Sequence, residues 1–266
     1  MFPKVIQFGE FFLPTYGLMV ALGFFAGLQV AIRLGARRGL HREVITNLAI
    51  YCALAGLAGA KLFMILFDLR DYVSGERPLF SIATLQAAGV FQGGLILAVI
   101  VAFWYMRRQN MSALTTADAL APGVALGHAI GRLGCLAVGC CWGAVCDRPW
   151  AIKFTNPEAE ALTGVPLGIP LHPTQLYETI AELIVFGFLW WRHGKPHREG
   201  EILGWYLVLS SALRFWIEFY RFHAQELPMG GPWSLTQWIS LALCGVGAWI
   251  LYGRKQFQPI GDGHMR

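Results

Sequence analysis

The sequence predicts an all-α integral membrane protein with about seven transmembrane helices, its N-terminus outside and its C-terminus in the cytoplasm. Three observations predict this class: the composition, the long apolar runs and the uneven distribution of basic residues. Hydrophobic residues make up 56% of the 266 and charged residues 14%, whereas soluble domains carry about 25% charged residues. This composition disfavours a soluble globule, a disordered chain and a secreted disulfide scaffold. The net charge of +5 is therefore attributed to membrane loops, and no nucleic acid partner is expected.

Seven stretches are long and apolar enough to cross a bilayer, which requires about 20 mostly apolar residues. No internal repeat or low-complexity segment stands out, so residues 1–266 are expected to form a single polytopic membrane domain. The expected spans are residues 15–34, 44–67, 87–106, 115–141, 174–191, 201–222 and 233–252.

The basic residues set the expected orientation, because cytoplasmic loops of membrane proteins are enriched in Lys and Arg. With Arg33 and Arg221, at the ends of their spans, counted with the adjacent loops, six of these residues lie on one side of the seven spans and three lie deep inside the spans. The other twelve lie in three loops and the tail on the opposite side, which is therefore expected to be cytoplasmic: Arg33, Arg37, Arg38, Arg42, Arg107, Arg108, Arg192, Lys195, Arg198, Arg254, Lys255 and Arg266.

The longest connection, residues 143–173, falls on the outer side and holds several Pro and Gly with Glu158 and Glu160. A connection of this length is usually functional or mobile. Two interpretations stay open: a loop that takes part in the chemistry, or a lid on the lipid headgroups without a chemical role.

Charged side chains inside a span are costly, and they commonly mark a functional site. In the expected topology, almost all of them lie toward the outer leaflet, and only Asp118 falls near the cytoplasmic end. One polar cavity open to the outer leaflet or the outside explains this one-sided set better than separate interfacial residues. Its expected members are Tyr16, Lys61, Gln92, His128, Arg132, His172, Glu178, Glu182, Arg214, Glu218 and Arg221.

Helical spacing predicts that several of these residues share a face. Arg214 and Glu218 are four residues apart, as are His128 and Arg132, and residues at this spacing lie on one side of a helix. A guanidinium stays charged when it loses water and binds phosphate through two parallel hydrogen bonds. Arginines in a lipid-facing cavity therefore indicate a phospholipid headgroup as ligand.

Four of the six cysteines form a C-x4-C-C-x4-C cluster: Cys135, Cys140, Cys141 and Cys146. The spacing is not the C-x2-C pattern of zinc sites, so no metal is expected from it. A disulfide, close packing of small residues and a catalytic thiol stay open as interpretations.

Five segments together resemble the bacterial prolipoprotein diacylglyceryl transferase family. They include Gly-Arg-Leu-Gly at 131–134 and His-Pro-Thr-Gln-Leu-Tyr-Glu at 172–178, and they follow the family's order along the chain. The five segments are residues 13–19, 91–96, 131–143, 172–178 and 214–221.

The resemblance implies an enzyme of the bacterial cytoplasmic (inner) membrane that needs no cofactor. It would transfer the diacylglyceryl group of phosphatidylglycerol to the lipobox cysteine of a preprolipoprotein, form a thioether and release glycerol phosphate. The resemblance also implies that membrane lipids surround the chain. The expected catalytic residues are Arg132, Arg214, His172 and Glu218. The expected substrate-binding residues are Arg132, Tyr16, Gln92, Gly93, Gly94, Tyr177, Glu178, Arg221 and Gly143.

The sequence departs from the family pattern at Gln92, where the glycine pair is often preceded by histidine. A glutamine cannot take the thiol proton, so Gln92 is expected to position a substrate, with His172 or Glu178 as alternative proton acceptors. Two other classes of function stay open: a catalytically silent paralogue that binds lipid or lipoprotein, and a transporter of anionic headgroups. The absence of a visible repeat disfavours the transporter.

Overall fold

The structure is a computed structural model that describes residues 2–8, 11–74, 84, 89–222 and 231–253. It is mostly helical and divides into two compact units, residues 1–34 with 117–266 and residues 35–116. The expected all-α class is confirmed, while the expectation of one domain stays a prediction.

A long helix lies at the position of each of the seven expected spans. Within the described residues, five of these helices are long and apolar enough to cross a membrane, and α5 and α8 fall outside that set. The exact number of spans and the orientation of the termini stay predictions. The seven helices are α1 (Thr15–Ala36), α2 (Arg42–Phe67), α5 (Phe91–Arg108), α6 (Ala113–Val138), α8 (Thr174–His193), α9 (Glu201–Ile217) and α10 (Leu235–Gly253).

Large apolar side chains cover the outer surface of these helices, including Phe25 on α1, Ile184 on α8 and Trp249 on α10. Soluble monomers rarely expose so large an apolar surface. Lipid contact explains it directly, because the bilayer interior is as apolar as these side chains.

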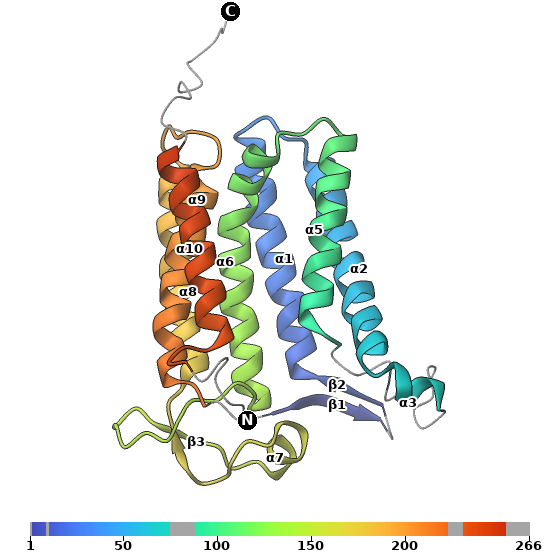
Figure 1. Ribbon diagram of the computed structural model, residues 1–266, viewed down its shortest axis with the longest axis vertical. Coiled ribbons are helices and arrows are strands. Elements are labelled where there is room, and N and C mark those ends of the chain that lie inside the picture. The colour runs from blue at the N-terminus through green and yellow to red at the C-terminus, as the bar shows by residue number, and fades with distance from the viewer. Residues whose placement is uncertain (1, 9–10, 75–83, 85–88, 223–230, 254–266) are drawn as a thin grey trace, which may run out of the picture. The chain divides into compact units, whose positions relative to one another are not determined.

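The first unit contains most of α1 and α6 together with α8, α9 and α10 (Figure 1). Its apolar core joins α6, α8 and the start of α9 through Ala121, Ala125, Val185, Leu189 and Ile202. Helices α1 and α6 approach closely where glycines face each other. A Cβ on Gly27 would lie 2.5 Å from the carbonyl oxygen of Gly123, so only glycine permits this backbone contact.

The connection between α6 and α8 is a folded structure with its own small core. It contains β3 (Ile152–Lys153), α7 (Pro157–Thr163) and β4 (Pro170–Leu171), and β3 pairs antiparallel with β4. Phe154 and Val165 are completely buried in its apolar cluster. The sequence did not predict these elements, because each is shorter than the periodicity that reveals a helix or strand.

Two short strands, β1 (Lys4–Phe8) and β2 (Phe11–Pro14), form an antiparallel hairpin before α1. Lys4 also makes an ion pair of 3.5 Å with Glu158 of α7. Figure 1 shows the hairpin, β3 and α7 at the same end of the first unit. This is the end at which α6 finishes and α8 begins.

The second unit consists of α2, α3 (Leu69–Val73) and α5. Helices α2 and α5 pack through small residues: a Cβ on Gly93 would lie 2.6 Å from the carbonyl oxygen of Gly59, and one on Gly94 would lie 2.7 Å from that of Gly56. The glycine pair after Gln92 thus allows two helix backbones to touch. Lys61 of α2 donates a hydrogen bond of 2.7 Å to the carbonyl oxygen of Thr84.

Candidate functional site

A cluster of arginines and glutamates lies at one end of the first unit, where four parts of the chain meet. Helix α6 contributes Arg132, α8 contributes Glu178, and α9 contributes Arg214. The short 3-10 helix η1 (Glu218–Tyr220) contributes Glu218, and Arg221 follows it directly. The sequence placed these five residues in one cavity, and the structure brings them together.

The carboxylate of Glu178 is the centre of the cluster and is almost completely buried, with 3% of its side chain exposed. Its Oε1 lies 2.7 Å from Nη1 of Arg214 and 3.7 Å from Nη1 of Arg221. Its Oε2 forms an ion pair with Nε of Arg132. One carboxylate thus holds guanidinium groups from three segments of the chain. Charge-assisted contacts of this kind fix geometry as well as adding stability.

Two further carboxylates complete the cluster. Glu218 Oε2 lies 3.0 Å from Nη2 of Arg214, and its Oε1 accepts a hydrogen bond of 3.0 Å from Ser234. Glu182 Oε1 lies 3.3 Å from His128 Nδ1, and its Oε2 accepts a hydrogen bond of 3.1 Å from Ser210. The formal charges of the three arginines and three glutamates therefore cancel, which lowers the cost of burying them.

His172 lies in a neighbouring aromatic group just before α8. Its Nδ1 is 3.1 Å from the hydroxyl oxygen of Tyr177, and that oxygen also accepts a hydrogen bond of 2.8 Å from Trp150. The ring of His172 contacts that of Tyr220, with centroids 5.1 Å apart. Burial, and then the positive charge of Arg148, lower the pKa of His172 below its ordinary value. The imidazole is consequently neutral at neutral pH and can accept a proton.

Gly143 lies where the loop after α6 crosses two other segments. Its amide donates to the carbonyl oxygen of His172 at 3.1 Å, and it bridges to Arg221 in an antiparallel pair. A Cβ at this position would lie 2.6 Å from the carbonyl oxygens of both His172 and Tyr220. Glycine therefore lets this loop connect the segment that carries His172 to the segment that carries Arg221.

The remaining expected site residues fall into two groups. Tyr16, at the start of α1, packs on the α6 backbone near the cysteines, since a Cβ on Gly134 would lie 3.4 Å from its Cα. Gln92, Gly93 and Gly94 belong to the second unit, so their position relative to the arginine cluster stays a prediction.

Sequence reasoning missed three polar residues that hold the site in place: Trp150, Ser210 and Ser234. Ser210 lies within the apolar helix α9 and Ser234 directly precedes α10, a setting in which serine also serves helix packing. Trp150 lies in the long connection of residues 143–173, away from the expected spans. Nothing in their spacing singled them out, because each acts on a residue that is distant in sequence.

The cysteines near the cluster have free thiols. All six cysteines are unpaired, so the structure contains no disulfide of the kind left open above. The sulfur atoms of Cys135, Cys140 and Cys141 nevertheless lie within 4.8 Å of one another. Nη1 of Arg132 lies 3.8 Å from the sulfur of Cys135, which connects this group to the arginine cluster.

Apolar helices around buried arginines, with a histidine nearby, describe a membrane protein with a buried polar site, and guanidinium groups of this kind can bind a phosphorylated or otherwise anionic group. Comparison with known proteins makes this class specific. The sequence pattern of the family described as prolipoprotein diacylglyceryl transferase matches residues 3–253. The chain therefore belongs to the prolipoprotein diacylglyceryl transferase family.

Individual relatives agree over nearly their whole length. A protein of Gloeobacter violaceus is 34% identical over 96% of this chain and 95% of its own. One of Vibrio cholerae is 32% identical over 96% of this chain and 93% of its own. One of Clostridium tetani is 30% identical over 88% of this chain and 90% of its own. All three are named phosphatidylglycerol–prolipoprotein diacylglyceryl transferase.

Proposed function

We propose that this enzyme transfers the diacylglyceryl group of phosphatidylglycerol to the lipobox cysteine of a preprolipoprotein, the first step of lipoprotein maturation. The thiolate sulfur bonds to the terminal glycerol carbon of the diacylglyceryl group. The bond between that carbon and the phosphate oxygen breaks, and glycerol phosphate leaves with the electron pair. The products are a thioether on the lipoprotein and glycerol phosphate.

The observation that carries this proposal is the organisation of three arginines around Glu178. The leaving phosphate gains negative charge as its bond to carbon breaks, so fixed cations stabilise the transition state more than the bound lipid. Arg132 and Arg214 are the proposed catalytic arginines. Each guanidinium has five N–H donors, so contact with Glu178 leaves donors for phosphate oxygens.

Glu178 and Glu218 have a positioning role in this proposal. Each contacts Arg214 and Arg221, and all four N–O distances are within 4.0 Å. Their negative charges offset the repulsion between the two guanidinium groups. Both oxygens of the Glu178 carboxylate already contact guanidinium groups. This leaves His172 as the proposed acceptor of the lipobox thiol proton.

The aromatic group around His172 supports that role. The hydroxyl oxygen of Tyr177 can accept from Trp150 and from Nδ1–H of His172 at once, since it has two lone pairs. In this tautomer Nε2 carries the free lone pair and can take the proton. Tyr177 then holds the ring, much as a second residue orients a catalytic histidine in other enzymes.

Five further residues are proposed to contact the substrates: Tyr16, Gln92, Gly93, Gly94 and Gly143. Gln92 would hydrogen-bond the headgroup or the peptide. Gly143 would shape the path between His172 and Arg221. Arg221 would contribute a third guanidinium to the phosphate.

We further propose seven spans with the N-terminus outside, in the bacterial inner membrane, and a cavity that opens toward the outer leaflet. The lipid then enters sideways from the bilayer and the peptide from the outer side. Labelling of Gly39→Cys and Ser74→Cys by a membrane-impermeant thiol reagent in intact cells tests this topology. Because the protein's own cysteines are free, the label is measured relative to the wild-type protein. We expect additional label at position 74 only, and additional label at position 39 contradicts the orientation.

The transferase activity itself is tested with purified protein, phosphatidylglycerol and a lipobox peptide. Wild type should form the diacylglyceryl thioether. Arg132→Lys keeps the charge but loses the planar fork, and turnover should fall about 100-fold, the size of a lost oxyanion contact. Arg192→Lys is the matched control, because Arg192 pairs with Glu201 at the opposite end of α8. Wild-type turnover in Arg132→Lys contradicts the proposed role.

Growth of cells depleted of their own transferase provides a second test. Rescue by this chain distinguishes a transferase from a silent paralogue or a transporter. Family membership and the names of the relatives do not favour either of those alternatives.

A further inference from the structure

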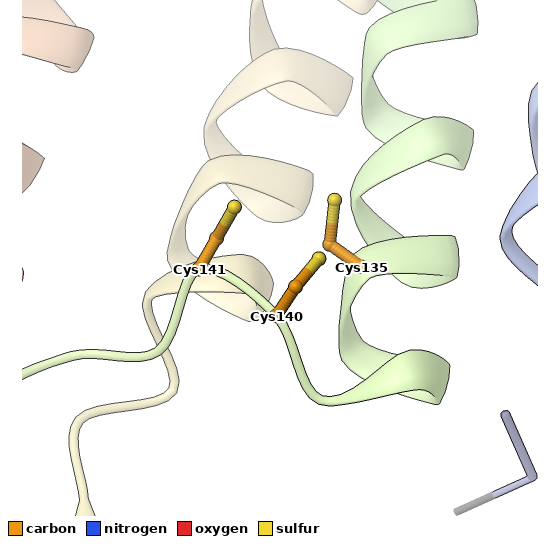
Figure 2. Close-up of side chains that lie close together, drawn as sticks. All are labelled: Cys135, Cys140 and Cys141. Carbon is orange, nitrogen blue, oxygen red and sulfur yellow. The ribbon is translucent and has the colours of Figure 1, made fainter. Parts of the chain in front are cut away.

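The three-thiol group beside Arg132 is not needed for the mechanism above. It consists of Cys135 near the end of α6 and of Cys140 and Cys141 in the turn that follows. Figure 2 shows the three sulfur atoms on the same side of this turn. All three sulfurs lie within 4.8 Å of one another. A metal with bonds of about 2.3 Å to each sulfur needs sulfur separations of roughly 3.7–4.0 Å, so small side-chain rotations suffice.

The backbone of the turn adopts an uncommon conformation that brings these thiols together. Cys141 has a φ of 60° and Gly139 a φ of 86°. A positive φ is unfavourable for a residue with a Cβ, and such strain is concentrated at functional sites. Side chains of successive residues in an extended chain point apart. The left-handed conformation at Cys141 instead directs its sulfur toward those of Cys135 and Cys140.

Buried contacts hold this conformation in place. Thr174 donates a hydrogen bond of 2.9 Å to the carbonyl oxygen of Cys141, and Gln175 donates one of 2.7 Å to that of Cys140. Both donors come from the first turn of α8 and are at most 1% exposed. The amide of Cys140 also donates to the carbonyl oxygen of Cys135 at 3.1 Å. Metal sites typically have ligands that surrounding hydrogen bonds hold in place, as these do here.

We propose that Cys135, Cys140 and Cys141 bind a thiophilic divalent cation, and that its fourth position is open to the thiol of the lipobox cysteine. Thiolates select soft ions such as Zn²⁺, and three protein ligands with one open position are typical of catalytic zinc. Cys135 is buried, whereas Cys140 and Cys141 are half-buried, so one side of the triangle is accessible.

The second part of this inference rests on the proposed transferase activity. A thiol that coordinates a divalent cation loses its proton, so the metal would present the substrate as thiolate and release one proton to His172 or water. The thiolate then attacks the glycerol carbon, and glycerol phosphate leaves with the electron pair. No atom is oxidised or reduced. The product thioether is a weak ligand and dissociates, which returns water to the fourth position. Gln92 cannot take the proton of the lipobox thiol, and the bound metal would supply the activation of that thiol.

Metal binding is tested first, without any assay of activity. Protein reduced and stripped of metal under anaerobic conditions is titrated with Zn²⁺ against a chromophoric chelator. We expect one ion per chain, protection of three thiols from alkylation, and loss of binding in Cys135→Ser, Cys140→Ser and Cys141→Ser. The matched controls Cys52→Ser and Cys244→Ser, on α2 and α10, should bind as wild type does. Circular dichroism and gel filtration confirm that each variant is folded.

The open position is tested with Co²⁺ in place of Zn²⁺. A lipobox peptide should change the visible spectrum of the Co²⁺-loaded protein, and the same peptide with serine at the acceptor position should not. Transfer by the stripped protein should fall about 100-fold, as expected for loss of proton removal, and should return with Zn²⁺.

Failure of this inference and failure of the proposed function give different results. Transfer by a wild-type protein that binds no Zn²⁺, or binding unaffected by the three cysteine variants, overturns the metal site and leaves the transferase intact. A disulfide among these cysteines in protein alkylated directly in native membranes also overturns the metal site. Zn²⁺ binding in a protein that never forms the thioether keeps the metal site and overturns its role in transfer.

Discussion

Arg214 Nη1 and Glu178 Oε1 lie 2.7 Å apart and join α9 to α8 through a nearly buried ion pair. The same carboxylate contacts Arg132 from α6 and Arg221 from the segment after η1. The arginines are therefore not independent phosphate ligands. Their common partner, Glu178, positions them relative to one another. The ion pairs that hold the four segments together therefore also arrange the site.

Glu178→Gln tests this relationship. The amide keeps the shape of the side chain but removes the charge that three guanidinium groups share. Breaking a buried ion pair from one side costs about 3–5 kcal/mol, so the thermal unfolding midpoint in detergent should fall clearly. Turnover should fall about 100-fold or more, because the cations lose their arrangement around the leaving phosphate.

The matched control for this prediction is Glu201→Gln. Glu201 pairs with Arg192 and accepts a hydrogen bond from the backbone of Arg198 at the other end of α8. It should lose some stability and keep its turnover. Equal turnover in the Glu178→Gln and wild-type proteins would show that the arginines are placed by the helices alone.

The residues of this cluster could be predicted because the membrane makes them conspicuous. A charged side chain in an apolar span has few structural explanations, so Arg132, Glu178, Arg214 and Glu218 stood out by context alone. Counting spans predicted a common depth for them, which stays a prediction. Which carboxylate contacts which guanidinium did not follow, because helix rotation and the crossing of the loop at Gly143 decide it.

Other features were beyond prediction for physical reasons. The convergence of Cys135, Cys140 and Cys141 depends on one positive φ at Cys141, and cysteine has no preference for that conformation that a sequence would reveal. The hairpin of β1 and β2 is too short to show a clear period. The distance from Gln92 to Arg132 depends on how the two units are placed, which local sequence does not encode.

Gly143→Ala tests the loop crossing. The added methyl group would lie 2.6 Å from the backbone of both His172 and Tyr220, so one segment must shift. Overpacking of this kind costs about 1–3 kcal/mol, and turnover should fall because the shift moves His172 relative to Arg221. Gly187→Ala, in the middle of α8 with open space at its Cβ, should keep wild-type stability and turnover. A neutral Gly143→Ala would show that the loop adapts freely.

Asp118→Ala separates stability from chemistry. The carboxylate of Asp118 accepts hydrogen bonds of 2.7 Å from the amide of Gly200 and 2.8 Å from that of Leu203, at the start of α9. Loss of such a cap costs about 0.5–2 kcal/mol, and Asp118→Asn should lose less because it keeps one acceptor oxygen. Asp118 and Arg132 are 14 residues apart on α6, about 20 Å along the helix. The unfolding midpoint should fall without a change in turnover, and a large loss of turnover would contradict the separation.

The pH dependence of transfer tests His172. Only its neutral form accepts a proton, so turnover should rise with pH as the conjugate acid is lost. Because burial and Arg148 lower the pKa of His172 from its ordinary 6.5, this rise should be centred below pH 6.5, and turnover should be nearly constant above it until other groups titrate. His172→Gln should lower the plateau, by roughly 100- to 10,000-fold for loss of a general base, and should remove the acid limb.

Arg148→Ala distinguishes a proton-accepting His172 from a purely structural one, because only the first predicts a shift of the acid limb. Removal of the nearby positive charge stabilises the imidazolium, so the pKa of His172 should rise and the acid limb should move to higher pH while the plateau stays.

Tyr177→Phe should lower the plateau, because the ring of His172 loses the partner that fixes its tautomer. Transfer rates with a lipobox peptide from about pH 5 to 8, around the ordinary histidine range, are sufficient for both variants. An acid limb that stays in place in Arg148→Ala and persists in His172→Gln would assign the proton to another acceptor, with the thiolate bound by Cys135, Cys140 and Cys141 as the next mechanism to examine.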